Sequence, residues 1–80
     1  MMNYTNGLGE MYKLDLHGVR HREVKNLVED FIYMNQGEFP LEIICGNSDK
    51  MIQLVIETTR SMGVETHMYR YGVIIVRRWH

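Results

Sequence analysis

The chain has 80 residues, 45% of them hydrophobic, and a single proline, so it has room for one compact domain with one core. Its formal net charge of −1 excludes a strongly cationic protein, and a lone cysteine, Cys45, excludes an internal disulfide, which favours the reducing cytoplasm. No apolar run approaches the ~20 residues that cross a bilayer, and the first ten residues lack the basic and apolar regions of a signal peptide, so we expect neither membrane insertion nor secretion.

The N-terminal part of the chain divides into a tail and a strand. Residues 1–10 carry glycines and asparagines without a periodic apolar pattern, so we expect a flexible N-terminal tail before a single domain of residues 11–80. The stretch MYKLDLH, residues 11–17, then alternates between apolar and polar side chains, which predicts a half-buried strand. The polar face of this strand carries Asp15 and His17.

A helix, a second strand and a second helix follow. From about His21, apolar residues recur at helical spacing until a glycine ends the pattern, which predicts the first helix. Residues 41–45, LEIIC, are too apolar for an exposed edge and predict a buried strand. Ser48 is the predicted N-cap of a second helix over residues 49–62, and Gly63 is its predicted end.

Two strands complete the pattern. Residues 64–70, VETHMYR, alternate and suit an edge strand, whereas residues 73–78, VIIVRR, are apolar on both faces and suit an interior strand. The element order β-α-β-α-β-β predicts an α/β two-layer sandwich, a four-stranded mixed sheet with both helices on one face, because right-handed crossovers place both helices on the same side. Asp15 and His17 would then lie on the open face at the carboxyl end of a parallel strand, where open α/β sheets bind ligands.

The motif LDLHG, residues 14–18, and this order of elements together resemble the Smr (small MutS-related) domain in a minimal stand-alone form. The resemblance runs from about Leu14 to Arg78. Members of that family bind nucleic acid, several cut DNA or RNA as endonucleases, and their fold is similar to the C-terminal domain of bacterial translation initiation factor three. The resemblance implies the strand order 1-2-4-3 with the last strand antiparallel. It also implies that Asp15 and His17 are catalytic, because the Asp-x-His core of the motif is the part linked to cleavage.

The family's second motif, His-Gly-x-Gly, is matched only in part. At the corresponding place the chain reads Cys45, Gly46, Asn47 and Ser48, which keeps only the first glycine. A cysteine neither holds a positive charge nor donates a strong hydrogen bond to phosphate. Two functions therefore stay open: an endonuclease acting on RNA or DNA, and a non-catalytic nucleic-acid-binding or protein-interaction adaptor that has lost cleavage with the altered motif.

The residue types of the first motif also have a direct chemical interpretation. Asp15 and His17 are two residues apart on one strand face, so their Cα atoms lie about 6.5–7 Å apart and their side chains can meet. A carboxylate fixes the tautomer of a neighbouring imidazole and prepares it to move a proton near neutral pH. We therefore assign proton transfer to His17 and the role of orienting group, base or metal ligand to Asp15. The alternative is structural: Asp15 accepts backbone N–H bonds and His17 caps the loop.

Basic, polar and glycine residues around the motifs are candidate nucleic-acid ligands, since cationic groups hold phosphates and aromatic rings stack on exposed bases. The candidates are Gly18, Arg20, Arg22, Lys25, Gly46, Asn47, Ser48, Lys50, Arg70, Tyr71, Arg77 and Arg78. Exposed helical faces and edge strands carry the same residue types for solubility and packing, so both interpretations stay open.

The cofactor is unknown from the sequence. A divalent metal ion would suit cleavage, and Asp15, His17, Cys45 and His67 could in principle converge on one, but no short ligand spacing such as C-x-x-C supports a metal site. We interpret Cys45 as a small packing residue rather than a nucleophile. The expected partner is nucleic acid, with or without a larger protein complex, and no membrane.

Overall fold

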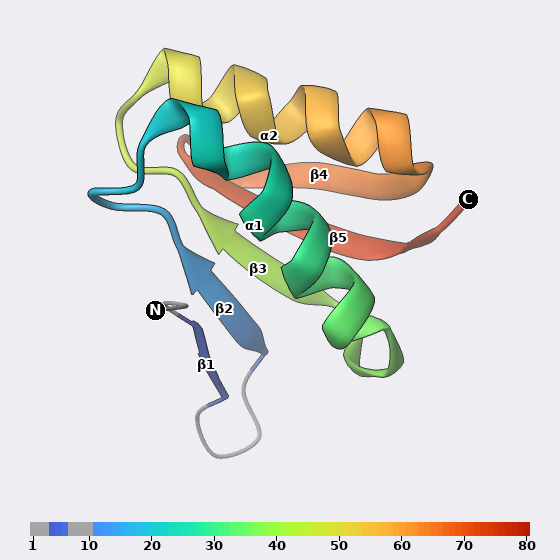
Figure 1. The fold of residues 1–80 in the computed structure, drawn as a ribbon. Helices are drawn as coiled ribbons and strands as arrows, with labels where there is room; N and C mark the ends of the chain where they lie inside the picture. The colour runs from blue at the N-terminus through green and yellow to red at the C-terminus, as the bar shows by residue number, and fades with distance from the viewer. Residues whose placement is uncertain (1–3, 7–10) are drawn as a thin grey trace.

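Two helices cover one face of a mixed sheet and leave its other face open in the computed structural model, which describes residues 4–6 and 11–80 (Figure 1). The helices are α1 (His21–Met34) and α2 (Asp49–Met62), and a short 3₁₀ turn, Gln36–Glu38, follows α1. The strands are β1 (Tyr4–Asn6), β2 (Tyr12–Asp15), β3 (Leu41–Ile44), β4 (Val64–Arg70) and β5 (Val73–Trp79). The predicted two-layer α/β fold is therefore confirmed.

The sheet has the strand order β1-β2-β3-β5-β4. Strands β2 and β3 are parallel, and Asp15 lies opposite Ile44. Strand β5 is antiparallel to both of its neighbours, β3 and β4. The four predicted strands thus keep the predicted order, with 73–78 in the interior and 64–70 at an edge, and β1 adds a short fifth strand.

Strand β1 lies within residues 1–10, where a flexible tail was expected. Tyr4 pairs with Leu14 and Asn6 with Tyr12, so residues 4–6 extend the sheet beyond β2. Three residues are too few to show an alternation, and the otherwise unpaired edge of β2 offers hydrogen-bonding partners to any extended segment beside it. The rest of the expected tail, residues 1–3 and 7–10, lies outside the described residues.

The core lies between the helices and the sheet, and it explains where the helices begin and end. Helix α1 buries Val24, Val28, Phe31 and Ile32, and α2 buries Met51, Ile52, Val55, Thr58 and Thr59. The hydroxyl of Ser48 accepts the N–H of Met51 at 3.1 Å, and Gly63 ends α2 with φ +83°, so both predicted caps are confirmed. Neither helix, within the part of the chain that the structure describes, is long and apolar enough to cross a membrane.

Candidate functional site

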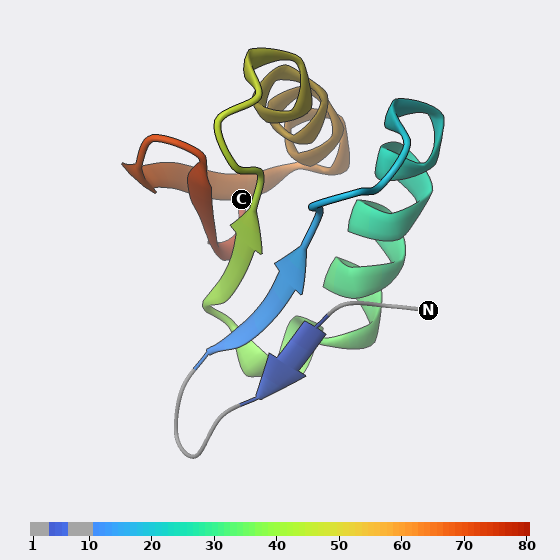
Figure 2. The ribbon, with the colours of Figure 1, turned by 90° about the vertical axis from the view of Figure 1, so that its left-hand side faces the viewer.

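Three loops meet at one end of the sheet, and we call this region the loop end: residues 16–20 after β2, 45–48 after β3, and 70–72 between β4 and β5 (Figure 2). The backbone N–H of Leu16 donates to the carbonyl of Ile44 at 2.9 Å. The N–H of Cys45 donates to the carbonyl of Gly72 at 2.7 Å. The first bond joins the loop after β2 to the end of β3, and the second joins the loop after β3 to the β4–β5 turn.

The first loop is a tight turn that brings His17 back towards β2. The N–H of Val19 donates to the carbonyl of Leu16 at 3.1 Å, and Gly18 has φ +78°, as the third residue of a type II turn requires. Strand β2 consequently ends at Asp15, two residues before the predicted end. His17 lies in the turn, where its ring can fold over the preceding carboxylate.

Asp15 and His17 form a hydrogen-bonded pair. His17 Nδ1 lies 2.6 Å from Asp15 Oδ1, and the backbone N–H of His17 donates to the same oxygen at 3.0 Å. The side chains are accessible, with exposed fractions of 67% for His17 and 46% for Asp15. The structural and chemical interpretations of the motif therefore coexist, because Asp15 both accepts a backbone N–H and orients an exposed imidazole.

The hydrogen bonds also set the ionisation of Asp15. Donation from the His17 backbone N–H lowers the pKa of Asp15, partial burial opposes this effect, and the His17 ring lowers the pKa further. The carboxylate is therefore ionised at neutral pH and can accept a hydrogen bond from Nδ1 of the ring. In the tautomer with its proton on Nδ1, the free lone pair lies on Nε2.

Two glycines hold the ring of His17 in place. Gly46 has φ +73°, and a Cβ atom there would lie 3.0 Å from His17 Nε2. Gly72 has φ +84°, and a Cβ atom there would lie 2.2 Å from the carbonyl oxygen of Gly46. The one glycine retained from the second motif is thus required by the close packing of His17 and of the β4–β5 turn around it.

The other residues of the second motif do not replace the family's histidine. The side chain of Cys45 is 4% exposed and belongs to the core, and burial raises the pKa of its thiol to about 11. Ser48 has φ −105°, which needs no glycine, and its hydroxyl caps α2. Asn47 is exposed beside them. The interpretation of Cys45 as a packing residue is confirmed.

We expect the Cys45 thiol to react with iodoacetamide at pH 8 about 100-fold or more slowly in the folded protein than in urea, because a pKa near 11 leaves little thiolate. The measurement is mass-spectrometric labelling over time. Equal rates in the folded and the unfolded chain would show that the thiol is accessible and ionised.

The predicted nucleic-acid ligands with long side chains separate into two regions. Arg20 lies at the start of α1, Lys50 in the first turn of α2, and Arg70 and Tyr71 at the β4–β5 turn, all exposed at or beside the loop end. Arg22 and Lys25 extend this region along the exposed side of α1. The candidates at and beside the loop end therefore come from three separate parts of the chain, at the starts of α1 and α2 and at the β4–β5 turn.

Arg77 and Arg78 are not brought together with the Asp15–His17 pair. The antiparallel register places Val73 beside Ile44 at the loop end, so the arginines of β5 lie at the opposite end of the sheet. There Arg78 makes two hydrogen bonds to Glu65, at 3.0 and 3.1 Å. Arg77 and Arg78 are close to Tyr71 in the sequence, but the direction of β5 carries them away from the Asp15–His17 pair.

The four residues named as a potential metal site do not converge. Cys45 points into the core, while His67 lies opposite Ile75 on β5, two strands away from the Asp15–Ile44 pair. Across residues 4–6 and 11–80, no group of three His, Cys, Asp or Glu side chains is placed to hold a metal ion.

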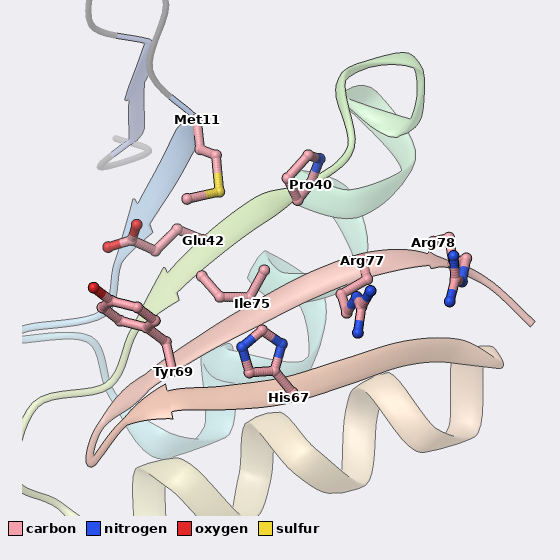
Figure 3. A pocket seen from close by; sticks show the side chains of 8 residues that line it. All are labelled: Met11, Pro40, Glu42, His67, Tyr69, Ile75, Arg77 and Arg78. Carbon is pink, nitrogen blue, oxygen red and sulfur yellow. The ribbon is translucent and has the colours of Figure 1, made fainter.

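The open face of the sheet contains a hollow of about 730 Å³, whose lining includes the predicted nucleic-acid ligands Arg77 and Arg78 (Figure 3). Its lining comprises Met11, Pro40, Glu42, His67, Tyr69, Ile75, Arg77 and Arg78. The alternation of His67 and Tyr69 along an edge strand was the available signal, because alternate residues of a strand share a face.

The geometry thus joins an exposed acid–imidazole pair to a cationic loop end and leaves a separate hollow on the open face. Comparison of the chain with protein-family models, with curated proteins and with solved structures gives no match, so its function is inferred from these residues and their arrangement.

Proposed function

We propose that the protein binds RNA or DNA at the loop end and cleaves phosphodiester bonds there with Asp15 and His17. The observation that carries the proposal is the 2.6 Å contact between His17 Nδ1 and Asp15 Oδ1 in a pair that stays exposed. An imidazole held in this way through Nδ1 keeps Nε2, which lies beside Gly46, as the nitrogen that can take a proton. That is the arrangement a general base needs.

The chemistry follows from the two ring nitrogens. His17 Nε2 takes the proton of the attacking hydroxyl group of the substrate or of water, and the ring becomes cationic. The attacking oxygen forms a bond to phosphorus, the P–O bond to the leaving oxygen breaks, and the leaving oxygen takes a proton from the cationic ring or from water. Asp15 stabilises this cation and keeps the ring in the correct orientation. Arg20 and Arg70 come from two different loops of the loop end and hold the phosphate, while the free N–H groups at the start of α1 favour its negative charge.

A non-catalytic nucleic-acid-binding adaptor is the second candidate function. The specific observation that favours it is Cys45, which is buried with a pKa of about 11 and supplies no proton donor where the family motif has a histidine. The acidic Asp49 in the first turn of α2 also opposes phosphate binding there. In this second candidate, the role of Asp15 is structural, and it includes accepting the N–H of His17.

Labelled single- and double-stranded RNA and DNA, incubated with and without Mg²⁺ at two salt concentrations, test the proposal. If the loop end neutralises two phosphates, affinity should fall about tenfold when the salt concentration is raised fourfold. Salt-dependent binding with cleavage supports the endonuclease, and salt-dependent binding without cleavage supports the adaptor. Absence of salt-dependent binding to every substrate would overturn both and would favour a face for protein contacts.

A further inference from the structure

The hollow on the open face combines aromatic rings with an apolar floor. His67 and Tyr69 occupy alternate positions of β4, so both side chains project over the open face, as Figure 3 shows. Ile75 of β5 lies opposite His67 in the register and lines the hollow between the rings and Glu42. The ring of Tyr69 is 69% exposed. Neither α1 nor α2 covers these rings, so both can contact a ligand.

The arginines at the rim differ in how strongly Glu65 holds them. Arg78 donates two hydrogen bonds to the Glu65 carboxylate, whereas Arg77 Nη1 approaches it only to 3.7 Å, beyond hydrogen-bond distance. Arg78 therefore compensates most of the Glu65 charge. The guanidinium of Arg77 keeps donors for a ligand in the hollow.

This combination of groups matches an unpaired nucleobase. Aromatic side chains stack on the face of any base, and a nearby guanidinium holds the adjoining phosphate. Glu42, on the far side of Ile75, repels a phosphate but accepts a hydrogen bond from a base amino group. In a duplex the base faces are covered by their neighbours, so only a single strand can use the hollow.

The hollow also lies next to the loop end along β4. Tyr69 is followed directly by Arg70, Tyr71 and Gly72, and Gly72 packs against Gly46 beside the His17 ring. A polynucleotide whose bases stack on β4 can therefore follow β4 to the Asp15–His17 pair.

We propose that the open face is a second binding site, formed by His67, Tyr69, Ile75 and Arg77, which holds the unpaired bases of a single-stranded nucleic acid. The inference rests on the proposed function, because it takes nucleic acid to be the ligand of the loop end. The hollow then gives the protein a preference for single strands.

Fluorescence anisotropy with a short labelled single strand and with a hairpin duplex of the same composition tests this site. In the Tyr69→Ala variant we expect affinity for the single strand to fall about fivefold or more, from the loss of one stacking ring, while affinity for the duplex stays the same. Tyr69→Phe keeps the ring and should bind like the native protein. Tyr33→Ala, at an exposed tyrosine of α1 in the other layer, is the matched control and should change neither affinity.

The outcomes separate this site from the function on which it rests. If the native protein shows no salt-dependent binding to either probe, the proposed function fails and the second site fails with it. If the native protein binds and Tyr69→Ala binds the single strand equally well, the second site is overturned while the loop end stands. Equal losses for the single strand and the duplex would also overturn it, because stacking cannot serve a duplex. Circular dichroism confirms that each variant is folded.

Discussion

Replacing Gly72 by alanine is expected to lower the free energy of unfolding by roughly 3 kcal/mol, more than a left-handed backbone alone would cost an alanine. Gly72 has φ +84°, and an added Cβ would lie 2.2 Å from the carbonyl oxygen of Gly46. That neighbour is backbone, so it cannot move aside without displacing the loop after β3. Urea unfolding followed by circular dichroism measures the loss.

Gly63→Ala is the matched control for this prediction. Gly63 has nearly the same backbone angle, φ +83°, but its added Cβ would meet nothing within 4 Å. Gly63→Ala should therefore lower the free energy of unfolding by only about 1 kcal/mol, the cost of the left-handed conformation for an alanine. The difference between the variants isolates the contact between Gly72 and Gly46. Equal losses would mean that the β4–β5 turn does not press on the loop after β3.

The contact between Gly72 and Gly46 also affects the Asp15–His17 pair, because Gly46 packs against the ring of His17. A Cβ atom on Gly46 would lie 3.0 Å from His17 Nε2, so the Gly46 backbone is close to the ring. A shift of that backbone would therefore move the surface against which the ring packs. Gly72 is thus a positioning residue that acts on the proposed base through one intervening glycine. A surface substitution elsewhere that lowers the free energy of unfolding as much as Gly72→Ala would leave the ring of His17 undisturbed.

The local patterns of the sequence predicted the fold because they coincide with the core. Leu14 and Leu16 are buried and alternate with the exposed Asp15–His17 pair, so one short alternation revealed both the strand and the site. The helix stripes and the caps at Ser48 and Gly63 likewise depend on neighbours within one turn of helix. Each of these features is decided by residues close together in the chain.

Features set by distant pairing could not be predicted. Gly72 and Gly46 are far apart in the sequence, and nothing in either local segment indicates that their backbones touch. The separation of Arg77 from the Asp15–His17 pair depends on the antiparallel direction of β5. The pairing of Tyr4–Asn6 with β2 depends on an available strand edge rather than on its own pattern.

Asp15→Asn is expected to slow phosphodiester cleavage about 100-fold or more, the range over which a positioned acid–base pair contributes. In the proposed mechanism the carboxylate accepts the hydrogen bond of His17 Nδ1, at 2.6 Å, and leaves Nε2 as the base. An asparagine amide can instead donate to Nδ1, which places the ring proton on Nε2 and abolishes the base. It also removes the charge that stabilises the imidazolium.

The same substitution should remove a pH dependence of stability. The folded pKa of Asp15 lies below its ordinary value, chiefly because the His17 backbone N–H donates to it. As the pH falls, the unfolded chain binds this proton first, so the carboxylate stabilises the fold fully above its ordinary pKa and loses that contribution as the pH falls through the folded pKa. Unfolding curves from neutral to acid pH should therefore decline less steeply for Asp15→Asn than for the native protein.

A double substitution decides whether Asp15 and His17 act as one unit. If they do, Asp15→Asn combined with His17→Ala should cleave no more slowly than His17→Ala alone, since either loss already disables the base. His80→Ala, at an exposed histidine directly after β5 and at the end of the sheet opposite the pair, should retain the native rate of cleavage. Cleavage that persists in Asp15→Asn, with an unchanged pH profile, would confine this aspartate to holding the turn. Binding without cleavage in the native protein would instead make the loop end a binding surface without chemistry, the outcome that the buried thiol of Cys45 favours.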